Sequence, residues 1–461
     1  MDMKKDDTIV AISTPPGEGG IAVVRLSGPE AISIAESIFR GKIDISKSES
    51  HKAYHGWIVD GSEPIDEVVL TLFRTPRSLT GEDVVEMSCH GGMFVSRRIL
   101  ELLVAGGARP ARPGEFTQRA FLHGKMDLSQ AEAVVDLIRA RTEASRRVAA
   151  YQLEGQLSKR LEEMRGHLMR VCSLLEIELD FCEEDVEFAS RKELMELLRS
   201  TREEMKALLA SFDRGKVCRE GIRMVIVGRP NVGKSSILNS LVERERAIVT
   251  EIPGTTRDTV EDVLDIEGLL FLVTDTAGVR EVQDPVESEG VRRTERALAE
   301  SDLVLLVFDG SESLKQEDET LIQRVKNLDK QVVAVINKVD LEQKIDIRKL
   351  KRRMPGTRFL RVSALRKKGI HDIIQALEQT VLSGELPQEG EVVITRVRHR
   401  DSIARAYERI GQAENSFRRG MSQEFIALDL RGALEALGEI TGQTTTDDIL
   451  DQIFSEFCIG K

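Results

Sequence analysis

Cysteine, proline and aromatic residues are scarce in this 461-residue sequence. The five cysteines are scattered and form no Cys-x-x-Cys pair, which argues against a zinc site or a disulfide framework and is typical of a reducing compartment. No apolar run approaches the ~20 residues that a membrane-spanning helix needs, and the charged residues 1–8 do not resemble a signal peptide. These absences predict a cytoplasmic protein without a membrane partner.

Positive charge is also in deficit, because the net charge is −12 at pH 7. This balance excludes a globally basic nucleic-acid binder but leaves room for a local basic face. Two helical stretches are locally basic, although such runs are more often solvated helix faces than phosphate contacts. They carry Arg139, Arg141, Arg146 and Arg147, and Arg396, Arg398, Arg400 and Arg405.

The chain is too long for a single core, and its texture changes along its length. Over residues 1–124, short apolar runs alternate with turn residues, which predicts a small α+β domain. The expected strands are residues 8–13, 21–27, 68–73 and 84–89, and the expected helices are residues 30–39 and 93–105. Over residues 125–215, apolar residues recur at three- and four-residue spacing, as they do over residues 384–461. This periodicity predicts long amphipathic helices.

Residues 216–383 alternate apolar strands with helix-length stretches. Such strands are typical of a parallel sheet that is covered on both faces. The expected strands are residues 224–227, 271–274, 303–308, 332–336 and 359–362. We therefore expect a multi-domain protein with an α+β N-terminal domain, an all-α helical bundle in two sequence parts and an inserted α/β domain. Short linkers are expected at residues 215–221 and 383–390.

A phosphate-binding loop is indicated by residues 228–235, which match G-x-x-x-x-G-K-S between an apolar strand and a helix. Backbone N–H groups of such a loop wrap the phosphates, and the helix N-terminus adds partial positive charge. Lys234 is expected to reach the β- and γ-phosphate oxygens as a catalytic residue, and the Ser235 hydroxyl to bind Mg²⁺. The predicted nucleotide contacts of this segment are Asn231, Val232, Gly233, Lys234, Ser235 and Ser236.

Three further segments follow apolar strands at their carboxyl ends, where ligands bind in open parallel sheets. In the first, Asp275 can hold magnesium through water and Gly278 can lend its N–H to the γ-phosphate. The second is Asn337-Lys338-Val339-Asp340, whose aspartate can accept guanine N1–H and the exocyclic amine. In the third, Ser363-Ala364, a backbone N–H can bind guanine O6. Four such segments in this order predict a GTP-hydrolysing domain.

Two features bear on how hydrolysis is activated. In Ras-like enzymes a glutamine after the D-x-x-G segment orients water, whereas Val279 follows Gly278 here. Asn231 lies inside the phosphate loop, where its side chain can either cap the loop or hold a monovalent cation. The residue alone does not decide between these roles, but the switch segment 250–258 contains two adjacent threonines, which favours the cation.

The whole chain resembles the MnmE (TrmE) family of tRNA-modifying GTPases. The resemblance rests on the GTPase segments together with residues 15–28 (PPGEGGIAVVRLSG), residues 112–122 (RPGEFTQRAFL) and the terminal residues 457–461 (FCIGK). It implies a homodimer formed through the N-terminal domains, with GTPase domains that meet when K⁺ and GTP are bound. By this resemblance Glu287 replaces the missing glutamine as the catalytic water-orienting residue.

The resemblance also implies the cation ligands and further nucleotide contacts. The K⁺ ligands are Asn231, the Thr250 and Ile252 carbonyls and Thr255, and the Mg²⁺ ligands are Ser235 and Thr256. The N-terminal domain is similar to folate-dependent one-carbon enzymes, which implies a site for 5-formyl-tetrahydrofolate or another one-carbon tetrahydrofolate. By motif, that site is formed by Arg25, Glu86, Lys125 and Lys461, each of which taken singly is an ordinary surface charge.

The function that the resemblance implies is modification of the tRNA wobble uridine. With an FAD-dependent partner of the MnmG (GidA) type, the enzyme would install aminomethyl or carboxymethylaminomethyl groups at C5, using a folate one-carbon unit. An alternative is a nucleotide-gated binding GTPase for RNA or ribosome assembly that performs no modification. A third possibility is a stand-alone folate-dependent transferase with a regulatory GTPase domain.

Overall fold

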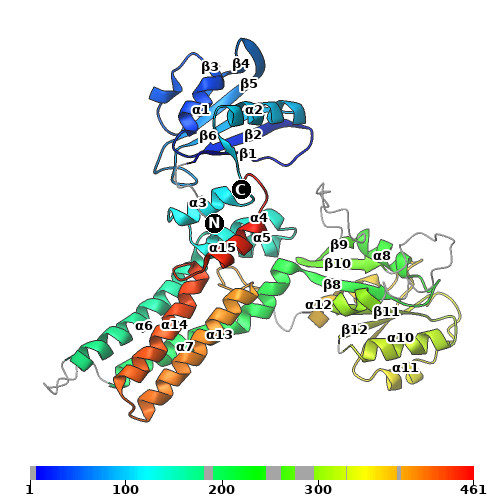
Figure 1. Cartoon of the computed structure of the whole chain (residues 1–461). Coiled ribbons are helices and arrows are strands. Elements are labelled where there is room, and N and C mark those ends of the chain that lie inside the picture. Colours follow the sequence, from blue (N-terminus) through cyan, green and yellow to red (C-terminus); the bar gives the residue numbers. More distant parts are fainter. Residues whose placement is uncertain (1–6, 181–190, 245–260, 276–294, 329, 382–385) are drawn as a thin grey trace. The chain divides into compact units, whose positions relative to one another are not determined.

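The computed structural model describes residues 7–180, 191–244, 261–275, 295–328, 330–381 and 386–461 (Figure 1). The chain divides into two compact units. Unit 1 comprises Met1–Val135, Leu153–Met169 and Leu430–Lys461, and unit 2 comprises Asp136–Gln152 and Arg170–Asp429. The helices α6 (Gln156–Asp180) and α14 (Gln423–Thr441) each contribute residues to both units. Within the described ranges, no helix is long and apolar enough to cross a membrane.

Unit 1 is built on a seven-stranded sheet in the order β3-β4-β5-β6-β2-β1-β7. Neighbouring strands are antiparallel except for the parallel pair β1 and β7. The strands are β1 (Ile9–Ile12), β2 (Gly19–Ser27), β3 (Phe39–Gly41), β4 (Lys52–Asp60), β5 (Glu63–Phe73), β6 (Val84–Gly91) and β7 (Arg109–Pro110). The α+β fold predicted for the N-terminal domain is confirmed.

The helices α1 (Ala31–Ile38) and α2 (Met93–Ala105) pack against this sheet and form a core with its inward side chains, such as Val24, Leu70 and Met87. A short 3₁₀ helix, η1 (Ile45–Lys47), precedes β4. Strand β4 was not among the strands expected from the sequence. Its apolar alternation is broken at Gly56, where a Cβ atom would lie 2.4 Å from the Phe39 ring, so the strand follows from a contact rather than from a pattern.

The side chains that alternate with this core form the opposite face of the same sheet. Register pairs His55 with Val69, Val69 with Ser88, and Ser88 with Val23. On this face, Ile21, Trp57 and Val69 are 68%, 43% and 42% exposed. We call it the open face of unit 1.

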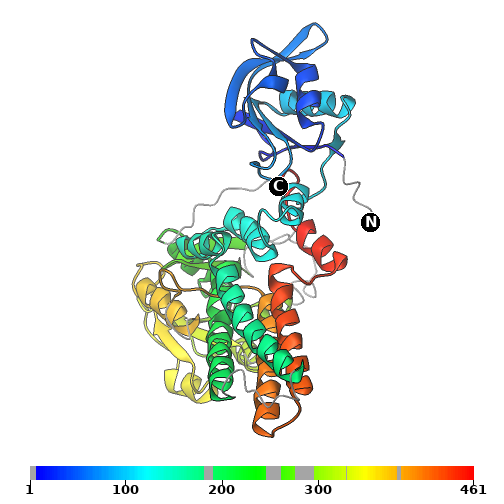
Figure 2. The same cartoon turned by 90° about the vertical axis from the view of Figure 1, so that its left-hand side faces the viewer.

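The C-terminal end of the chain packs within unit 1. In both Figure 1 and Figure 2 the C-terminal helix α15 (Asp447–Ser455) lies beside α3 (Glu115–Leu122). Phe454 and Phe457 join Leu128 and Ala131 of α4 (Leu128–Arg139) in one apolar cluster. The terminal residues after α15 are thereby carried to the N-terminal sheet.

Unit 2 contains a six-stranded sheet in the order β13-β12-β11-β8-β10-β9. Its strands are β8 (Ile222–Val227), β9 (Glu261–Ile266), β10 (Leu269–Asp275), β11 (Leu303–Asp309), β12 (Gln331–Asn337) and β13 (Arg358–Arg361). All five strands expected from the sequence are present and parallel. A sixth strand that was not expected from the sequence, β9, pairs antiparallel with β10 at the edge of the sheet. Glu267 and Gly268 both have positive φ and make the two-residue hairpin turn that joins them.

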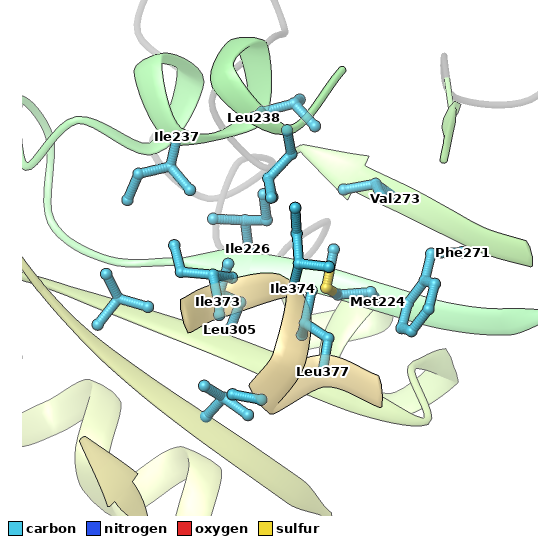
Figure 3. Packing of buried hydrophobic residues seen from close by; sticks show 14 of the residues in the cluster. Met224, Ile226, Ile237, Leu238, Phe271, Val273, Leu305, Ile373, Ile374 and Leu377 are labelled. Atoms are coloured by element: carbon cyan, nitrogen blue, oxygen red, sulfur yellow. The ribbon is translucent and has the colours of Figure 1, made fainter. Parts of the chain in front are cut away.

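Helices cover both faces of this sheet, as expected. On one face, α8 (Lys234–Val242) and α12 (Ile370–Val381) pack on β8, β10 and β11, and Figure 3 shows Ile237 and Ile374 turned toward Met224 and Ile226. On the other face, α10 (Gln316–Lys326) and α11 (Ile347–Arg353) bury Ile322 against the strands. Burial on both faces explains why these strands are apolar throughout.

The helical part of unit 2 includes α5 (Glu143–Leu153), α7 (Arg191–Glu220) and α13 (Val397–Arg418). Arg202 of α7 donates to Glu414 of α13 at 3.3 Å and lies 4.3 Å from the Tyr407 ring centroid. The linker expected at residues 215–221 is wrong, because α7 continues to Glu220. Gly215 permits close packing there, since a Cβ atom would lie 2.3 Å from the Ile394 carbonyl oxygen.

Candidate functional sites

The phosphate loop leaves β8 at Gly228, which lies so close to β11 that a Cβ atom would be 2.5 Å from the Val307 carbonyl oxygen. Asn231 and Gly233 have φ values of 64° and 96°. Left-handed residues in such a loop turn successive N–H groups toward one concave side, which suits an anion. Helix α8 begins directly after Gly233 and adds its N-terminal partial charge.

The Lys234 ammonium is held over this loop. Its Nζ donates to the carbonyl oxygens of Gly228 at 2.9 Å and Arg229 at 3.0 Å, and the residue is 8% exposed. Two backbone contacts therefore fix where the positive charge lies. The placement agrees with the expected role of Lys234 toward β- and γ-phosphate oxygens, which stays a prediction.

Arg229 anchors the same loop from behind. Its Nε donates to Asp318 at 2.8 Å and its Nη2 to Glu312 at 3.0 Å. Asp318 is buried and also accepts the Lys315 backbone N–H, so it joins the phosphate loop to the start of α10. The sequence analysis did not single out Arg229. The signal in the sequence was that a charged residue occupies one of the variable positions of the G-x-x-x-x-G-K-S motif.

One amide side chain links three of the four predicted segments. Asn337 is 3% exposed, and its Nδ2 donates to the Val232 carbonyl oxygen at 2.9 Å. Its Oδ1 accepts the Ala364 N–H at 3.0 Å. The structure therefore brings the phosphate loop, the N-K-V-D segment and the S-A segment together, as their positions at strand ends predicted.

The side chains around the expected base site are also fixed. Lys338 has a φ of 63°, and its Nζ lies 2.6 Å from Asp309 Oδ2. Hydrogen bonding from Ser363 holds the pKa of Asp340 below its usual value. Asp340 is therefore charged at neutral pH, as an acceptor of two guanine N–H groups must be.

The backbone N–H groups of the S-A segment have partners within the chain. That of Ser363 donates to the Lys368 carbonyl oxygen at 3.0 Å, and that of Ala364 donates to Asn337. Binding of guanine O6 by this segment stays a prediction.

The remaining predicted residues of this site are only partly described. Asp275 ends β10, and its Cα pairs with that of Ile226 beside the start of the phosphate loop. Ser235 and Ser236 lie in the first turn of α8. The positions outside the described residues are Thr250, Ile252, Thr255, Thr256, Gly278, Val279 and Glu287.

A second group of predicted residues meets in unit 1, around Arg25 of β2. Its Nε donates to Glu86 of β6 at 2.8 Å, and its guanidinium lies 5.6 Å from the centroid of the Phe116 ring. Their side chains are 14% and 27% exposed, so the pair remains accessible to a ligand.

The C-terminal tail reaches the same place. The Gly460 carbonyl oxygen accepts from Arg25 Nη1 at 3.3 Å and from the Ser13 hydroxyl at 3.1 Å. The Lys461 carbonyl oxygen accepts the Phe116 N–H at 3.2 Å. Three of the four residues expected at the folate site are thus gathered, although they are up to 436 positions apart in sequence. The fourth, Lys125, donates to the Pro76 carbonyl oxygen.

An ion network that the sequence analysis missed lies beneath this group. Glu115, at the start of α3, is 1% exposed and accepts from Arg109 and from the Arg112 backbone N–H. Burial raises its pKa, but the bonds from Arg109 and Arg112 outweigh that effect and leave the pKa below its usual value. Arg119 pairs with Asp7 at 2.5 Å and with Glu82 at 3.0 Å.

Members of both basic stretches have partners within the chain. Arg396 pairs with Asp136 at 2.8 Å, and both side chains are at most 13% exposed. Arg146 pairs with Glu143, and Arg147 donates to the Pro387 carbonyl oxygen at 3.1 Å. These contacts favour the solvated or internally paired interpretation over a continuous phosphate-binding surface.

The fold and the first site define the class of protein. A six-stranded sheet carries a phosphate loop and an N-K-V-D segment at its strand ends, which is the arrangement of a P-loop GTPase. The model of the helical domain of MnmE matches residues 128–458, and the model of the N-terminus of the GTP-binding protein TrmE matches residues 8–125. The chain belongs to the MnmE family of tRNA modification GTPases.

Full-length relatives agree with this assignment. The chain is similar to the tRNA modification GTPase MnmE of Natranaerobius thermophilus, with 44% identity over 458 residues that cover 99% of this chain and 100% of the relative. It is 46% identical over 462 residues to the protein of the same name from Geobacter sulfurreducens, with 100% of each chain covered.

Among solved structures, Aquifex aeolicus Era bound to GDP and aluminium fluoride is 27% identical and covers 41% of this chain and 66% of its own. Its TM-score is 0.28, so the assignment rests on the full-length relatives.

Proposed function

We propose that this GTPase acts in modification of the tRNA wobble uridine. The full-length likeness to proteins named for tRNA modification supports this function. So does the C-terminal tail that packs on Arg25, because a GTPase that only switches has no need of such a tail. The test is nucleoside analysis of tRNA from cells that lack the gene. Loss of an aminomethyl-type modification at the wobble position is expected, and an unchanged nucleoside profile would reject the proposal.

Magnesium suits the chemistry of the phosphate loop. Ser235 lies in the first turn of α8, directly after the lysine expected to contact the phosphates, and the carboxyl end of β10 brings Asp275 to the same edge. Ser235 and Thr256 would hold the ion, and Asp275 would hold it through water. The ion would offset the negative charge that develops on the phosphate oxygens during hydrolysis.

Potassium is the proposed activator of hydrolysis, with Asn231, Thr250, Ile252 and Thr255 as its ligands. Asn231 has a left-handed backbone, which asparagine adopts more readily than most residues with a Cβ atom, so asparagine fits both the turn of the loop and the role of a ligand. Glu287 would orient the attacking water. The hydrolysis rate should rise strongly when K⁺ replaces Na⁺, and an equal rate in both salts would remove this part of the proposal.

The gathered residues of unit 1 are proposed to bind a one-carbon tetrahydrofolate such as the 5-formyl form. Arg25 and Lys461 would neutralise the glutamate carboxylates of the folate, and Glu86 would accept the pterin N–H groups, with Lys125 as a further cation. The buried Phe116 ring lies 5.6 Å from the Arg25 guanidinium and helps to hold that cation in place for a ligand. A titration with 5-formyl-tetrahydrofolate tests the site directly.

The open face of unit 1 is the proposed dimer interface. It presents Trp57 and Val69 to solvent along paired strands, and apolar side chains on a sheet face are typical of a surface that becomes buried on association. Two copies would pair through this face, and an FAD-dependent protein of the MnmG type would complete the modifying complex with tRNA. We propose that the homodimer, its FAD-dependent partner and tRNA meet in the cytoplasm.

We propose domain limits of 1–124 for the folate and dimerisation domain, 216–383 for the GTPase domain, and 125–215 with 384–461 for the helical domain, with α7 continuing across the limit at 215 to Glu220. The alternative of an RNA-binding switch without modification chemistry leaves the Arg25 site unused. The nucleoside analysis separates the two functions.

A further inference from the structure

The N-K-V-D segment is held by residues that belong to none of the four predicted segments. Gln343, three residues after Asp340, donates through Nε2 to the carbonyl oxygens of Lys338 at 3.0 Å and Leu341 at 3.1 Å. One side chain therefore closes the loop on either side of the aspartate that is expected to bind the base. The left-handed φ of Lys338 shows that the loop needs such support, since that conformation is costly for a residue with a Cβ atom.

The end of β11 supports the same loop from the opposite side. The Gly310 N–H donates to the Asn337 carbonyl oxygen at 2.8 Å, and its own carbonyl oxygen accepts the Lys344 N–H at 2.9 Å. A Cβ atom on Gly310 would lie 2.5 Å from Gln343 Oε1 and 2.8 Å from the Asn337 carbonyl oxygen. Glycine is needed here for close approach, which lets Gln343 lie between β11 and the loop.

Asp309 fixes the second group of the segment. It is 6% exposed, accepts from Lys338 Nζ at 2.6 Å, and is itself held by the Ser311 N–H at 2.9 Å and hydroxyl at 2.6 Å. Burial alone would raise its pKa, but the bonds from Lys338 and Ser311 hold the pKa below its usual value. The lysine is therefore drawn toward β11 by a charged, oriented carboxylate.

We propose that Gln343 and Asp309 are positioning residues for base recognition, with separate effects. Gln343 orients the backbone around Asp340 and so determines how well that carboxylate accepts both guanine N–H groups. Asp309 orients Lys338, whose stem would lie against the plane of the purine, a surface that all purines share. The inference rests on the guanine-nucleotide site described above.

The two roles predict different losses for GTP and for ITP, whose base lacks the exocyclic amine. In Q343M, which keeps the length of the side chain, the Asp340 carboxylate is misplaced for both guanine N–H groups and GTP binds about 10-fold more weakly. ITP presents N1–H but no exocyclic amine, so one bond is weakened instead of two and its affinity falls less than that of GTP, by about 3-fold. The preference for GTP over ITP therefore shrinks.

In D309N the orientation of Lys338 is weakened while the shape of residue 309 is kept. Affinity for GTP and for ITP should fall by the same factor, about 5-fold, because both bases present the same ring face to the lysine. The ratio of the two affinities stays at the value of the unaltered protein.

The measurement is the dissociation constant of non-hydrolysable GTP and ITP analogues with the full chain, by competition against a fluorescent GDP. The exposed neighbour provides the matched control, since E342A should change neither constant. A thermal unfolding profile for each variant shows that the protein is folded. Equal losses for GTP and ITP in Q343M, or a changed ratio in D309N, would overturn the assignment of roles. Unchanged constants in both variants would overturn the proposal altogether.

Discussion

The two sites of this molecule are encoded in opposite ways. The nucleotide site of unit 2 is formed by short contiguous segments that each end a strand, and Asn337 joins them through two hydrogen bonds. The Arg25 site of unit 1 is formed by single residues from β2, β6 and the C-terminal tail. The first site is specified locally and assembled by the topology of a parallel sheet. The second exists only when the last residues of the chain pack on the first domain.

This difference predicts that each site can be damaged without the other. The largest effect is expected for Lys234→Ala. Its ammonium is held by two carbonyl oxygens of the phosphate loop, so the alanine variant removes a positive charge that has a fixed place. GTP hydrolysis should fall by at least about 100-fold, measured as phosphate release at saturating GTP.

The exposed Lys344 serves as the matched control, and its alanine variant should keep the full rate. Binding of 5-formyl-tetrahydrofolate should be the same in both variants. Loss of folate binding in Lys234→Ala would contradict the separation of the two sites.

The anchor of the phosphate loop offers the next largest effect. Asp318→Asn removes the buried charge that faces Arg229 and should destabilise unit 2 by about 3 kcal/mol, because the buried guanidinium keeps only the more exposed Glu312 as a counter-charge. Glu312→Gln changes the solvent-exposed acceptor of the same guanidinium and should leave unfolding nearly unchanged. Differential scanning calorimetry of the two variants decides the point. Equal shifts would show that burial is not what makes the Arg229 anchor matter.

A smaller effect is expected at the Arg25 site. Arg25→Met keeps a long side chain over Phe116 but removes the bonds to Glu86 and Gly460. Affinity for 5-formyl-tetrahydrofolate should fall by about 10-fold, which corresponds to one charge-assisted hydrogen bond. Arg97→Met on the surface of α2 is the control, because Arg97 pairs only with the exposed Glu101 among the described contacts. A titration by calorimetry in which both variants bind equally would argue against Arg25 as a ligand.

The same contrast explains how much could be predicted from the sequence. The apolar strands predicted the layered fold of unit 2. The positions of the motif segments at strand ends predicted that these segments meet. The residues that hold those segments in place were not predicted. Arg229 acts through Asp318, and Gln343 acts through backbone carbonyl oxygens of its own loop, and no sequence pattern indicates either partner.

Two errors in secondary structure have a similar origin. The sequence around Gly215 was interpreted as a linker, whereas the glycine lets helix α7 approach the Ile394 carbonyl. Strand β9 was missed because Glu267-Gly268 is a less typical hairpin turn than Asn-Gly. In both places a tertiary or turn contact outweighed the local composition.

The smallest expected effect is the pH dependence of the stability of unit 1. The pKa of Glu115 is lowered in the folded protein by Arg109 and Arg112 against the effect of burial. A carboxyl with a lowered pKa stabilises the fold above its unfolded pKa, and this contribution is lost as the pH falls through the folded value. As the pH falls below about 5, unit 1 should therefore lose stability through this group.

Urea unfolding can be followed at the single tryptophan, Trp57, which lies in β4 of unit 1 and so reports on that unit. In Glu115→Gln the group cannot titrate, so unit 1 should be less stable at neutral pH, and its stability should fall less steeply below pH 5. The exposed Glu101→Gln should retain the slope of the unaltered protein. If the slope is the same in Glu115→Gln, the acid sensitivity of unit 1 comes from other carboxylates, with Asp7 the next to test, because its pKa is also lowered by Arg109 and Arg119 against the effect of burial.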